Sequence, residues 1–496
     1  MHRSIIAAVL TALLVGCNSS DSNTDTFSKT GIEPNTPVNR SCPANMQCGL
    51  LPVPKSYAND NGEKVDIFYA VHKAIDADKR IGILLLNFGG PGGEAVWGAS
   101  NMVDYYLPQE ILERFDIVGL DPRGTGGSAF APELTDCAVA QNNGSGNCDS
   151  TYAQIAPYLG SNTIVKDIDQ LRIFLGEDKL NFLGYSYGTR LGSLYANTFP
   201  QKVRALVLDS PMPPATGNYT DLRLGNTVGH DLVANYRLEF NAARKYQYEN
   251  IISSVIYNDY YFASDGESLY PGDAQTLLSA TISREHTGDW KEIKDGLFTL
   301  LDEDTASQLR TDLYYVSSSS ETTNAQLRSS ALFKAVVCTD ESNALSASDV
   351  AARQYSFENA SALYGLINFY ITDMCADWPI QRDPIAMIEN MEQRLAGQQI
   401  LVIGGKYDPA TPYHWAEEMV SSFGNLGSLI TVDKLVNHGF SFNDMNCIDQ
   451  KTTQYLLDPA TKVESLTCAN TQQVKTSFSA KSKPAHPTQK ALTGTY

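Results

Sequence analysis

The sequence predicts an α/β fold: a mostly parallel sheet covered by helices, with a mainly helical cap inserted between the late strands. Short apolar runs rich in branched residues recur along the chain, and amphipathic stretches such as 163–175 and 413–423 separate the later runs. The alternation stops after residue 214 and resumes near residue 399. The expected strands are 65–71, 81–88, 115–120, 180–183, 205–208, 400–403 and 429–435.

The first residues have the composition of an export signal. Arg3 precedes an apolar stretch that is too short to span a bilayer, and the ending Leu14-Val15-Gly16-Cys17 resembles a bacterial lipobox. The resemblance implies a signal peptide at 1–16, cleavage before Cys17, and lipid on that residue. Residues 17–41 are then expected to form a flexible tether. An ordinary secretory signal with an incidental cysteine is the alternative.

Charge and cysteine usage narrow the class of protein. The formal net charge of −19 argues against nucleic acid as a partner, because that would require clustered Lys and Arg. Without Cys17, eight of the nine cysteines remain, which suggests four disulfides in an exported chain. No Cys-x-x-Cys spacing occurs, so we expect no metal. Sequence-local pairing, one of 105 possible connectivities, joins Cys42 to Cys48, Cys137 to Cys148, Cys338 to Cys375 and Cys447 to Cys468.

The stretch GYSYGTR, residues 184–190, supplies the candidate nucleophile. A Gly-x-Ser-x-Gly pattern is a weak signal alone, but here it lies between a predicted strand and a helix-like pattern. A tight turn between a strand and a helix exposes a serine hydroxyl above a sheet, and the flanking glycines prevent collisions with neighbouring backbone. We therefore interpret Ser186 as a nucleophile.

A serine nucleophile needs a base and an acid that orients the base. In a sheet of this kind the chain order is serine, acid, histidine. Asp408 follows the strand 400–403 and is favoured as the acid over Asp209, which follows the strand 205–208. His438 follows the last predicted strand and is favoured as the base over the other histidines after the serine, which are His230, His286, His414 and His486.

Acyl transfer also requires hydrogen-bond donors for the developing oxyanion. The segment NFGGPGG, residues 87–93, follows a strand and is nearly bare of side chains, so its backbone N–H groups can approach a substrate. The N–H of Tyr187, directly after the serine, is the second expected donor. A phosphate-binding loop is excluded because no Lys-Ser/Thr follows the glycines.

Six motifs together resemble the α/β-hydrolase peptidases of the prolyl iminopeptidase and tripeptidyl aminopeptidase group. They are NFGGPGG, DPRGTGGS, GYSYGT, ALVLDSP, GGKYDPATP and NHGFS, and the cysteine-containing stretches further resemble the secreted, disulfide-bearing tripeptidyl aminopeptidase branch. The resemblance implies a triad of Ser186, Asp408 and His438, an oxyanion loop at Gly89 and Gly90, and a cap that recognises a free amino end. One departure is Phe88, where the family usually has proline.

The implied organisation places the first part of the hydrolase core at 42–214, the helical cap at 215–390, the second part of the core at 391–475 and a flexible tail at 476–496. Recognition of an ammonium group requires carboxylates on the cap, and Asp340 and Glu341 are the first candidates, beside Glu239 and Asp373. Tyr257, Tyr260 and Tyr261 could line an apolar pocket, although core packing is the other use of such residues.

The predicted function is a serine aminopeptidase that acts on peptides, without a cofactor, from a lipid anchor in the bacterial cell envelope. A carboxylesterase or lipase is the alternative enzyme, because fold and triad do not determine the acyl group. A binding protein on a hydrolase scaffold is the non-enzymatic alternative, against which the serine, acid and histidine in the correct chain order argue.

Overall fold

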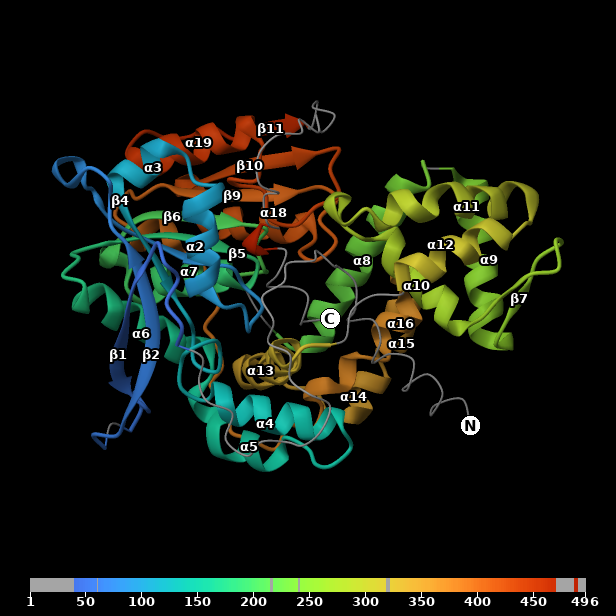
Figure 1. The fold of residues 1–496 in the computed structure, drawn as a ribbon, viewed down its shortest axis with the longest axis horizontal. Helices are drawn as coiled ribbons and strands as arrows, with labels where there is room; N and C mark the ends of the chain where they lie inside the picture. Colours follow the sequence, from blue (N-terminus) through green and yellow to red (C-terminus); the bar gives the residue numbers. More distant parts are fainter. Residues whose placement is uncertain are drawn as a thin grey trace.

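The computed structural model describes residues 40–59, 61–214, 217–239, 241–317, 322–469 and 486–488. The predicted signal peptide, Cys17 and nearly all of the predicted tether and tail lie outside these residues. The main sheet has nine strands in the order β1-β2-β4-β3-β5-β6-β9-β10-β11 and lies on the left in Figure 1. Its strands are β1 (Gln47–Pro54), β2 (Lys64–His72), β3 (Gly82–Asn87), β4 (Phe115–Leu120), β5 (Leu180–Tyr185), β6 (Val203–Asp209), β9 (Ile400–Gly405), β10 (Gly427–Asp433) and β11 (Leu466–Ala469).

The sheet is parallel from β4 to β11, whereas β2 is antiparallel to both β1 and β4. Strands β3, β4, β5 and β9 are buried along their whole length, as expected for strands covered on both faces. The carboxyl ends of parallel strands meet at one edge of the sheet, and loops from that edge provide the residues discussed below.

Helices cover both faces of the sheet. One face packs against α2 (Ala95–Tyr105), α3 (Gln109–Arg114) and α19 (Asn446–Leu457), whose apolar side chains share a core with the strands. The other face packs against α6 (Ser161–Phe174), α7 (Tyr187–Thr198) and α18 (Tyr413–Ser422). Helices α4 (Ala131–Asn142) and α5 (Asp149–Ile155) contribute to this second core. The predicted α/β-hydrolase architecture is confirmed.

Two strands of the main sheet were not predicted from the sequence. β1 contains Pro52 and Pro54, which lack the N–H needed inside a sheet and are tolerated because β1 is an edge strand. β11 has only four residues and forms the opposite edge. The run 65–71 lies in β2, where Ile67 and Val71 are buried on one face and Phe68 and Ala70 on the other. Val65 and Tyr69 are half-buried next to the edge strand.

The chain between β6 and β9 is mainly helical, as predicted. It contains α8 (Tyr219–Arg237), α9 (Ala242–Asn258), α10 (Pro271–Thr281), α11 (Asp289–Glu303), α12 (Ser307–Ser317), α13 (Asn324–Asp340), α14 (Ala347–Ala351), α15 (Gln354–Ala360), α16 (Gly365–Phe369) and α17 (Met391–Arg394), with a small hairpin of β7 (Tyr261–Phe262) and β8 (Ser268–Leu269). Residues 232–252 have one continuous amphipathic pattern in the sequence. The structure divides it into two helices, because Asn241 caps the start of α9 through its side-chain oxygen.

The inserted segment has two parts. Helices α9 to α12 build a lobe with a hydrophobic core of its own, and this outer lobe projects beside the sheet (Figure 1). Helix α13 instead packs directly on α4 and joins the core that covers the sheet. The cap thus reaches the edge of the sheet through α13, while the outer lobe extends away from it.

The structure contains the four expected cysteine pairs, Cys42–Cys48, Cys137–Cys148, Cys338–Cys375 and Cys447–Cys468. The third pair links α13 to the 3₁₀ turn Thr372–Cys375 inside the cap. Within the described part of the chain, no helix has both the length and the apolar character needed to cross a membrane.

Candidate active site

Ser186 lies at the sharp turn between β5 and α7. Its backbone has φ 56° and ψ −125°, a conformation that residues other than glycine rarely adopt. A Cβ added at Gly188 would lie 2.7 Å from the carbonyl oxygen of Asn87, and one added at Gly184 would collide with the Gly188 carbonyl. The glycines on both sides of Ser186 are therefore required by the closeness of neighbouring backbone, as the sequence pattern suggested.

The glycine loop after β3 lies directly against this turn. A Cβ added at Gly89 would lie 2.7 Å from Ser186 Cβ and 3.0 Å from the Tyr187 nitrogen. The Gly89 N–H donates to the side-chain oxygen of Asn87 at 3.1 Å, so this N–H is already occupied. Of the two predicted loop glycines, Gly90 is consequently the better candidate oxyanion donor, opposite the N–H of Tyr187 in the first turn of α7.

The structure brings Asp408 and His438 together. Both carboxylate oxygens of Asp408 lie 2.9 Å from Nδ1 of His438, and both side chains are fully buried. Asp408 is itself held by the N–H groups of Ala410 and Thr411 and by the Thr411 hydroxyl. A carboxylate in this position fixes the imidazole so that Nδ1 carries the proton and Nε2 is available as a base.

Asp209, the alternative acid, has a different set of partners. Its carboxylate accepts hydrogen bonds from the N–H groups of Phe440 and Ser441 and from the Ser441 hydroxyl. The neighbouring Ser210 hydroxyl accepts the N–H of Gly439 at 2.9 Å. The end of β6 thus holds the loop that follows His438, whereas Asp408 contacts the ring. This geometry favours Asp408 as the acid.

Ser186 and His438 are attached to the same point of the fold. The Ser186 N–H donates to the Asp209 carbonyl at 3.0 Å, and the Asp209 and Ser210 side chains hold the loop beside His438. Nε2 of His438 is buried and has no hydrogen-bond partner among the described residues, and the structure gives no Ser186–His438 hydrogen bond. Such contacts are often long in enzymes without substrate and shorten when substrate binds.

The other histidines have other environments. His230 is buried on α8, where Nε2 contacts the Pro409 carbonyl and burial lowers its pKa to about 3. His414 lies on α18, and burial lowers its pKa as well. His486, in the predicted tail, is buried and packs edge-on against Tyr106 and Tyr185. The side chain of His286 lies outside the described part of the chain.

The two acids predicted to bind a substrate amine are both buried where the cap meets the core. Asp340 accepts hydrogen bonds from the backbone N–H and the hydroxyl of Ser161, at 2.8 and 2.5 Å. Glu341 accepts the N–H of Tyr219 at 2.8 Å and pairs with Arg382 at 3.2 Å. Burial raises the pKa of both carboxyls, that of Asp340 to about 6. The predicted role in amine binding stays a prediction. Glu239 and Asp373, the other two candidates, are exposed.

The sequence analysis missed three residues that shape the site. Asn87 holds Gly89, as described above, and Asp121 accepts the N–H groups of Ala95 and Val96, which fixes the start of α2 directly after the glycine loop. The Ser161 hydroxyl lies 2.6 Å from the hydroxyl of Tyr187. Asn87 and Asp121 belong to motifs that the sequence displays, but Ser161 lies in no motif and only the fold brings it near Tyr187.

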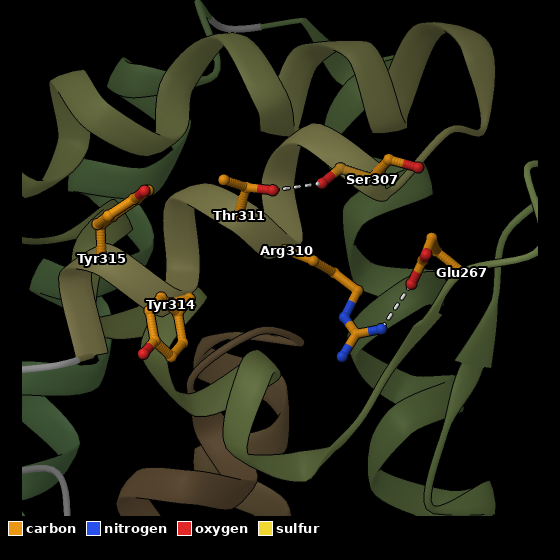
Figure 2. Close-up of a pocket in the computed structure, with 6 residues that line it drawn as sticks. All are labelled: Glu267, Ser307, Arg310, Thr311, Tyr314 and Tyr315. Carbon is orange, nitrogen blue, oxygen red and sulfur yellow. Dashed lines mark hydrogen bonds and ion pairs between the residues drawn. The ribbon is translucent and has the colours of Figure 1, made fainter.

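A separate pocket of about 340 Å³ opens on the outer lobe (Figure 2). It is lined by Glu267, Ser307, Arg310, Thr311, Tyr314 and Tyr315. Arg310 and Glu267 form an ion pair there, and the six side chains include no histidine to serve as a base. Tyr257 and Tyr260 are exposed on the same lobe and Tyr261 is half-buried, so they form no enclosed pocket.

Two family models match the chain. The family described as alpha/beta hydrolase fold matches residues 82–247, and the family described as TAP-like protein matches residues 364–468. The first segment contains Ser186 and the second contains Asp408 and His438.

Three curated relatives are similar over most of their length. The serine protease Hip1 of Mycobacterium tuberculosis is 28% identical over 471 residues, covering 86% of this chain and 88% of the relative. The tripeptidyl aminopeptidase of Streptomyces lividans is 25% identical, with coverages of 86% and 84%. Carboxylesterase B of Mycobacterium tuberculosis is 29% identical, with coverages of 85% and 86%. Among solved structures, a proline iminopeptidase from Mycobacterium smegmatis aligns with a TM-score of 0.40 and 15% identity, over 82% of this chain and 97% of that one.

Proposed function

Because the chain belongs to the α/β-hydrolases and its C-terminal part matches the TAP-like family, we propose that it is a serine exopeptidase that cleaves peptides near their free amino end. The carrying observation is the buried Asp408–His438 pair beside the strained Ser186 turn. Relatives named as a serine protease and a tripeptidyl aminopeptidase support peptides as the substrate class.

The proposed reaction passes through an acyl-enzyme. Nε2 of His438 takes the proton from the Ser186 hydroxyl as Oγ attacks the peptide carbonyl carbon. The N–H groups of Gly90 and Tyr187 stabilise the oxyanion, and the protonated His438 then gives its proton to the leaving amine. Water repeats the sequence and releases the short N-terminal fragment, so that Ser186 returns to its starting state.

The direct test compares four reporters on the full-length protein in detergent. These are a tripeptidyl reporter, a prolyl reporter, the same tripeptide with a blocked amino end, and a short-chain ester, each with wild type and Ser186→Ala. We expect turnover of the free-amino peptides by wild type alone. Turnover of the blocked tripeptide at the same rate would refute exopeptidase specificity, and activity in Ser186→Ala would refute the nucleophile.

A carboxylesterase is the second candidate, because carboxylesterase B is 29% identical over a similar span. The same four reporters separate the two functions. Ester turnover without peptide turnover would keep Ser186 as the nucleophile and replace the peptidase assignment.

We also propose that the protein is exported and held at the bacterial cell envelope by lipid on Cys17. The four disulfides support export, because such bonds persist in oxidising compartments. Expression of wild type and Cys17→Ser with a radiolabelled fatty acid tests the anchor. Label in the membrane fraction of wild type alone is the expected result, and equal labelling of both would refute the assignment.

A further inference from the structure

A chain of buried hydrogen bonds joins the cap to the residue after Ser186. It runs from the Asp340 carboxylate at the end of α13, through the Ser161 hydroxyl at the start of α6, to the Tyr187 hydroxyl. We propose that Asp340 and Ser161 are positioning residues that hold Tyr187, and with it the oxyanion-binding N–H, in the orientation that catalysis needs. The inference rests on the function proposed above, in which that N–H binds the oxyanion.

The direction of the chain follows from counting protons. Ser161 has one hydroxyl proton, which it donates to Asp340 Oδ2 at 2.5 Å, while its backbone N–H donates to Oδ1 at 2.8 Å. An ionised carboxylate only accepts, so the Ser161 oxygen remains as the acceptor for Tyr187. The Tyr187 hydroxyl therefore donates to Ser161 at 2.6 Å. All three side chains are at most 2% exposed, so water does not compete for these bonds.

Arg190 supports the charged state of Asp340. Its side chain lies one turn after Tyr187 on α7, is 2% exposed, and has no hydrogen-bond partner among the described residues. Electrostatic attraction links it to Asp340, while the nearby Asp383 opposes the charge of that carboxylate. A positive charge near Asp340 favours its ionised form, in which Asp340 accepts from Ser161 and Ser161 accepts from Tyr187.

The position of Tyr187 matters because the turn is strained. Ser186 has a positive φ, and such a conformation persists only where surrounding contacts hold it. On the serine side, the Asp209 carbonyl accepts the Ser186 N–H and the Thr189 hydroxyl donates to the Ser186 carbonyl. The hydrogen bond from Tyr187 to Ser161 provides the hold on the helix side.

The same cap helix also contacts the opposite side of the oxyanion site. A Cβ added at Gly92, in the glycine loop, would collide with Ser329 of α13, and Arg328 of α13 pairs with Glu94 directly after that loop. Helix α13 thus contacts the glycine loop through its N-terminal half, and its last residue reaches Tyr187 by way of Ser161. A change in how α13 lies on the core would move both sets of donors together.

Tyr187→Phe is the decisive variant, and the fold provides a matched control. Tyr195, two turns further along α7, donates its hydroxyl to Asp169 of α6 at 2.9 Å and is equally buried. Tyr195→Phe therefore removes a tyrosine–carboxylate contact between the same two helices, away from Ser186. We expect Tyr187→Phe to lower kcat about tenfold or more without a matching rise in KM, because misplaced catalytic groups cost about that much or more. Tyr195→Phe should lower Tm and leave kcat unchanged.

The rate of Ser186 modification by a fluorophosphonate gives a readout that needs no peptide substrate. We expect this rate to fall in Tyr187→Phe in parallel with kcat. Asp340→Asn should lower it as well, because an amide N–H facing Ser161 turns the serine proton toward Tyr187 and removes the acceptor. Adding Tyr187→Phe to Asp340→Asn should cause little further loss, since both act on one chain.

Two failures can be told apart. Equal labelling of wild type and Ser186→Ala would refute the proposed function, and the positioning role with it. If wild type is labelled specifically, and folded Tyr187→Phe is labelled at the same rate as folded Tyr195→Phe, the positioning role alone would be refuted. A loss in Tyr187→Phe that appears only as a higher KM would also overturn it, since positioning of the oxyanion donor acts on kcat.

Discussion

At the scale of single residues, two buried aspartates near His438 have different roles, which the sequence could assign only by chain order. Asp408 contacts the His438 ring with both oxygens, and Asp209 holds the backbone that follows the ring. Chain order predicted the first contact, because Asp408 lies in the loop after β9, and the next strand, β10, leads to His438. Nothing in the sequence indicated that Asp209 would accept so many donors from residues 440 and 441.

Asp408→Asn should lower kcat by about 10³- to 10⁴-fold, because an amide cannot stabilise the imidazolium and can select the wrong tautomer. Its Tm should change little, since the variant side chain still accepts the N–H groups of Ala410 and Thr411. Steady-state kinetics and thermal denaturation measure the two effects. Asp209→Asn is the matched control and should mainly lower Tm; full activity in Asp408→Asn would disprove its role as the acid.

The pH dependence of stability contains a contribution from Asp449 on α19. Its carboxylate accepts the Phe442 N–H in the loop after His438. Burial, followed by the nearby charges of Asp444 and Asp209, raises the Asp449 pKa to about 7. A pKa that is higher in the folded than in the unfolded state makes stability fall as pH rises, here from about pH 4 to pH 7.

Asp449→Asn removes the buried charge that lowers stability at high pH, and the amide oxygen still accepts the Phe442 N–H. We expect the variant to gain about 4 kcal/mol of unfolding free energy at pH 8, because each unit by which the pKa is raised corresponds to about 1.4 kcal/mol, and almost nothing at pH 4. Urea denaturation of both proteins at the two pH values measures the difference. A variant that is less stable than wild type at pH 8 would show that the charge of Asp449 is favourable in the folded protein.

At the scale of elements, the buried strands were predictable and the edges were not. The run 400–403 is continuously apolar and the run 115–120 is interrupted only by Asp116, as expected for strands covered on both faces, and both runs form strands in the sheet. β1 contains two prolines, so its sequence resembles a loop. It is tolerated in the sheet because β1 pairs with β2 alone. The break between α8 and α9 depends on a cap by Asn241, a local hydrogen bond that hydrophobic periodicity does not report. In the same way, the motifs indicated Ser186, Asp408 and His438, whereas Ser161 reaches Tyr187 only through the packing of α6 on α7.

The disulfides should differ in their effect on stability, because they close loops of different length. Cys338–Cys375 spans 37 residues and Cys42–Cys48 spans six. Replacing both cysteines of the longer loop with serine should lower the unfolding free energy by about 4 kcal/mol, and the same change in the shorter loop by about 2 kcal/mol. Guanidinium denaturation of the two double variants measures the order, and the reverse order would show that loop length does not control their contributions.

At the scale of the whole molecule, three hydrophobic clusters organise the described chain. Two cover the faces of the sheet, and the third lies inside the outer lobe of the cap. The third cluster shares few helices and strands with the other two, so the outer lobe has a core that can unfold independently. The Asp340–Ser161–Tyr187 chain lies on the α13 side of the cap, which packs with the sheet.

Leu297→Ala and Leu206→Ala form a matched pair for this division. Both leucines are buried, the first in the lobe core and the second in the sheet core. Each change should cost about 2 to 5 kcal/mol locally. We expect Leu297→Ala to lower the midpoint temperature of one calorimetric transition and to leave the rate of the fluorophosphonate reaction at Ser186 unchanged. Leu206→Ala should lower the midpoint temperature of a second transition. A single shared transition in both variants would show that the lobe and the sheet unfold together.

The topology of the sheet has a consequence for the order in which the protein becomes active. β6 and β9 are neighbours in the sheet, yet the whole cap separates them in the chain, and Asp408 and His438 follow β9. In chain order, Ser186 therefore precedes the proposed acid and base by the whole length of the cap. Until nearly all of the polypeptide has been made and β9 and β10 have joined the sheet, the serine is inert. The proposed catalytic site is thus completed only by the last strands of the sheet.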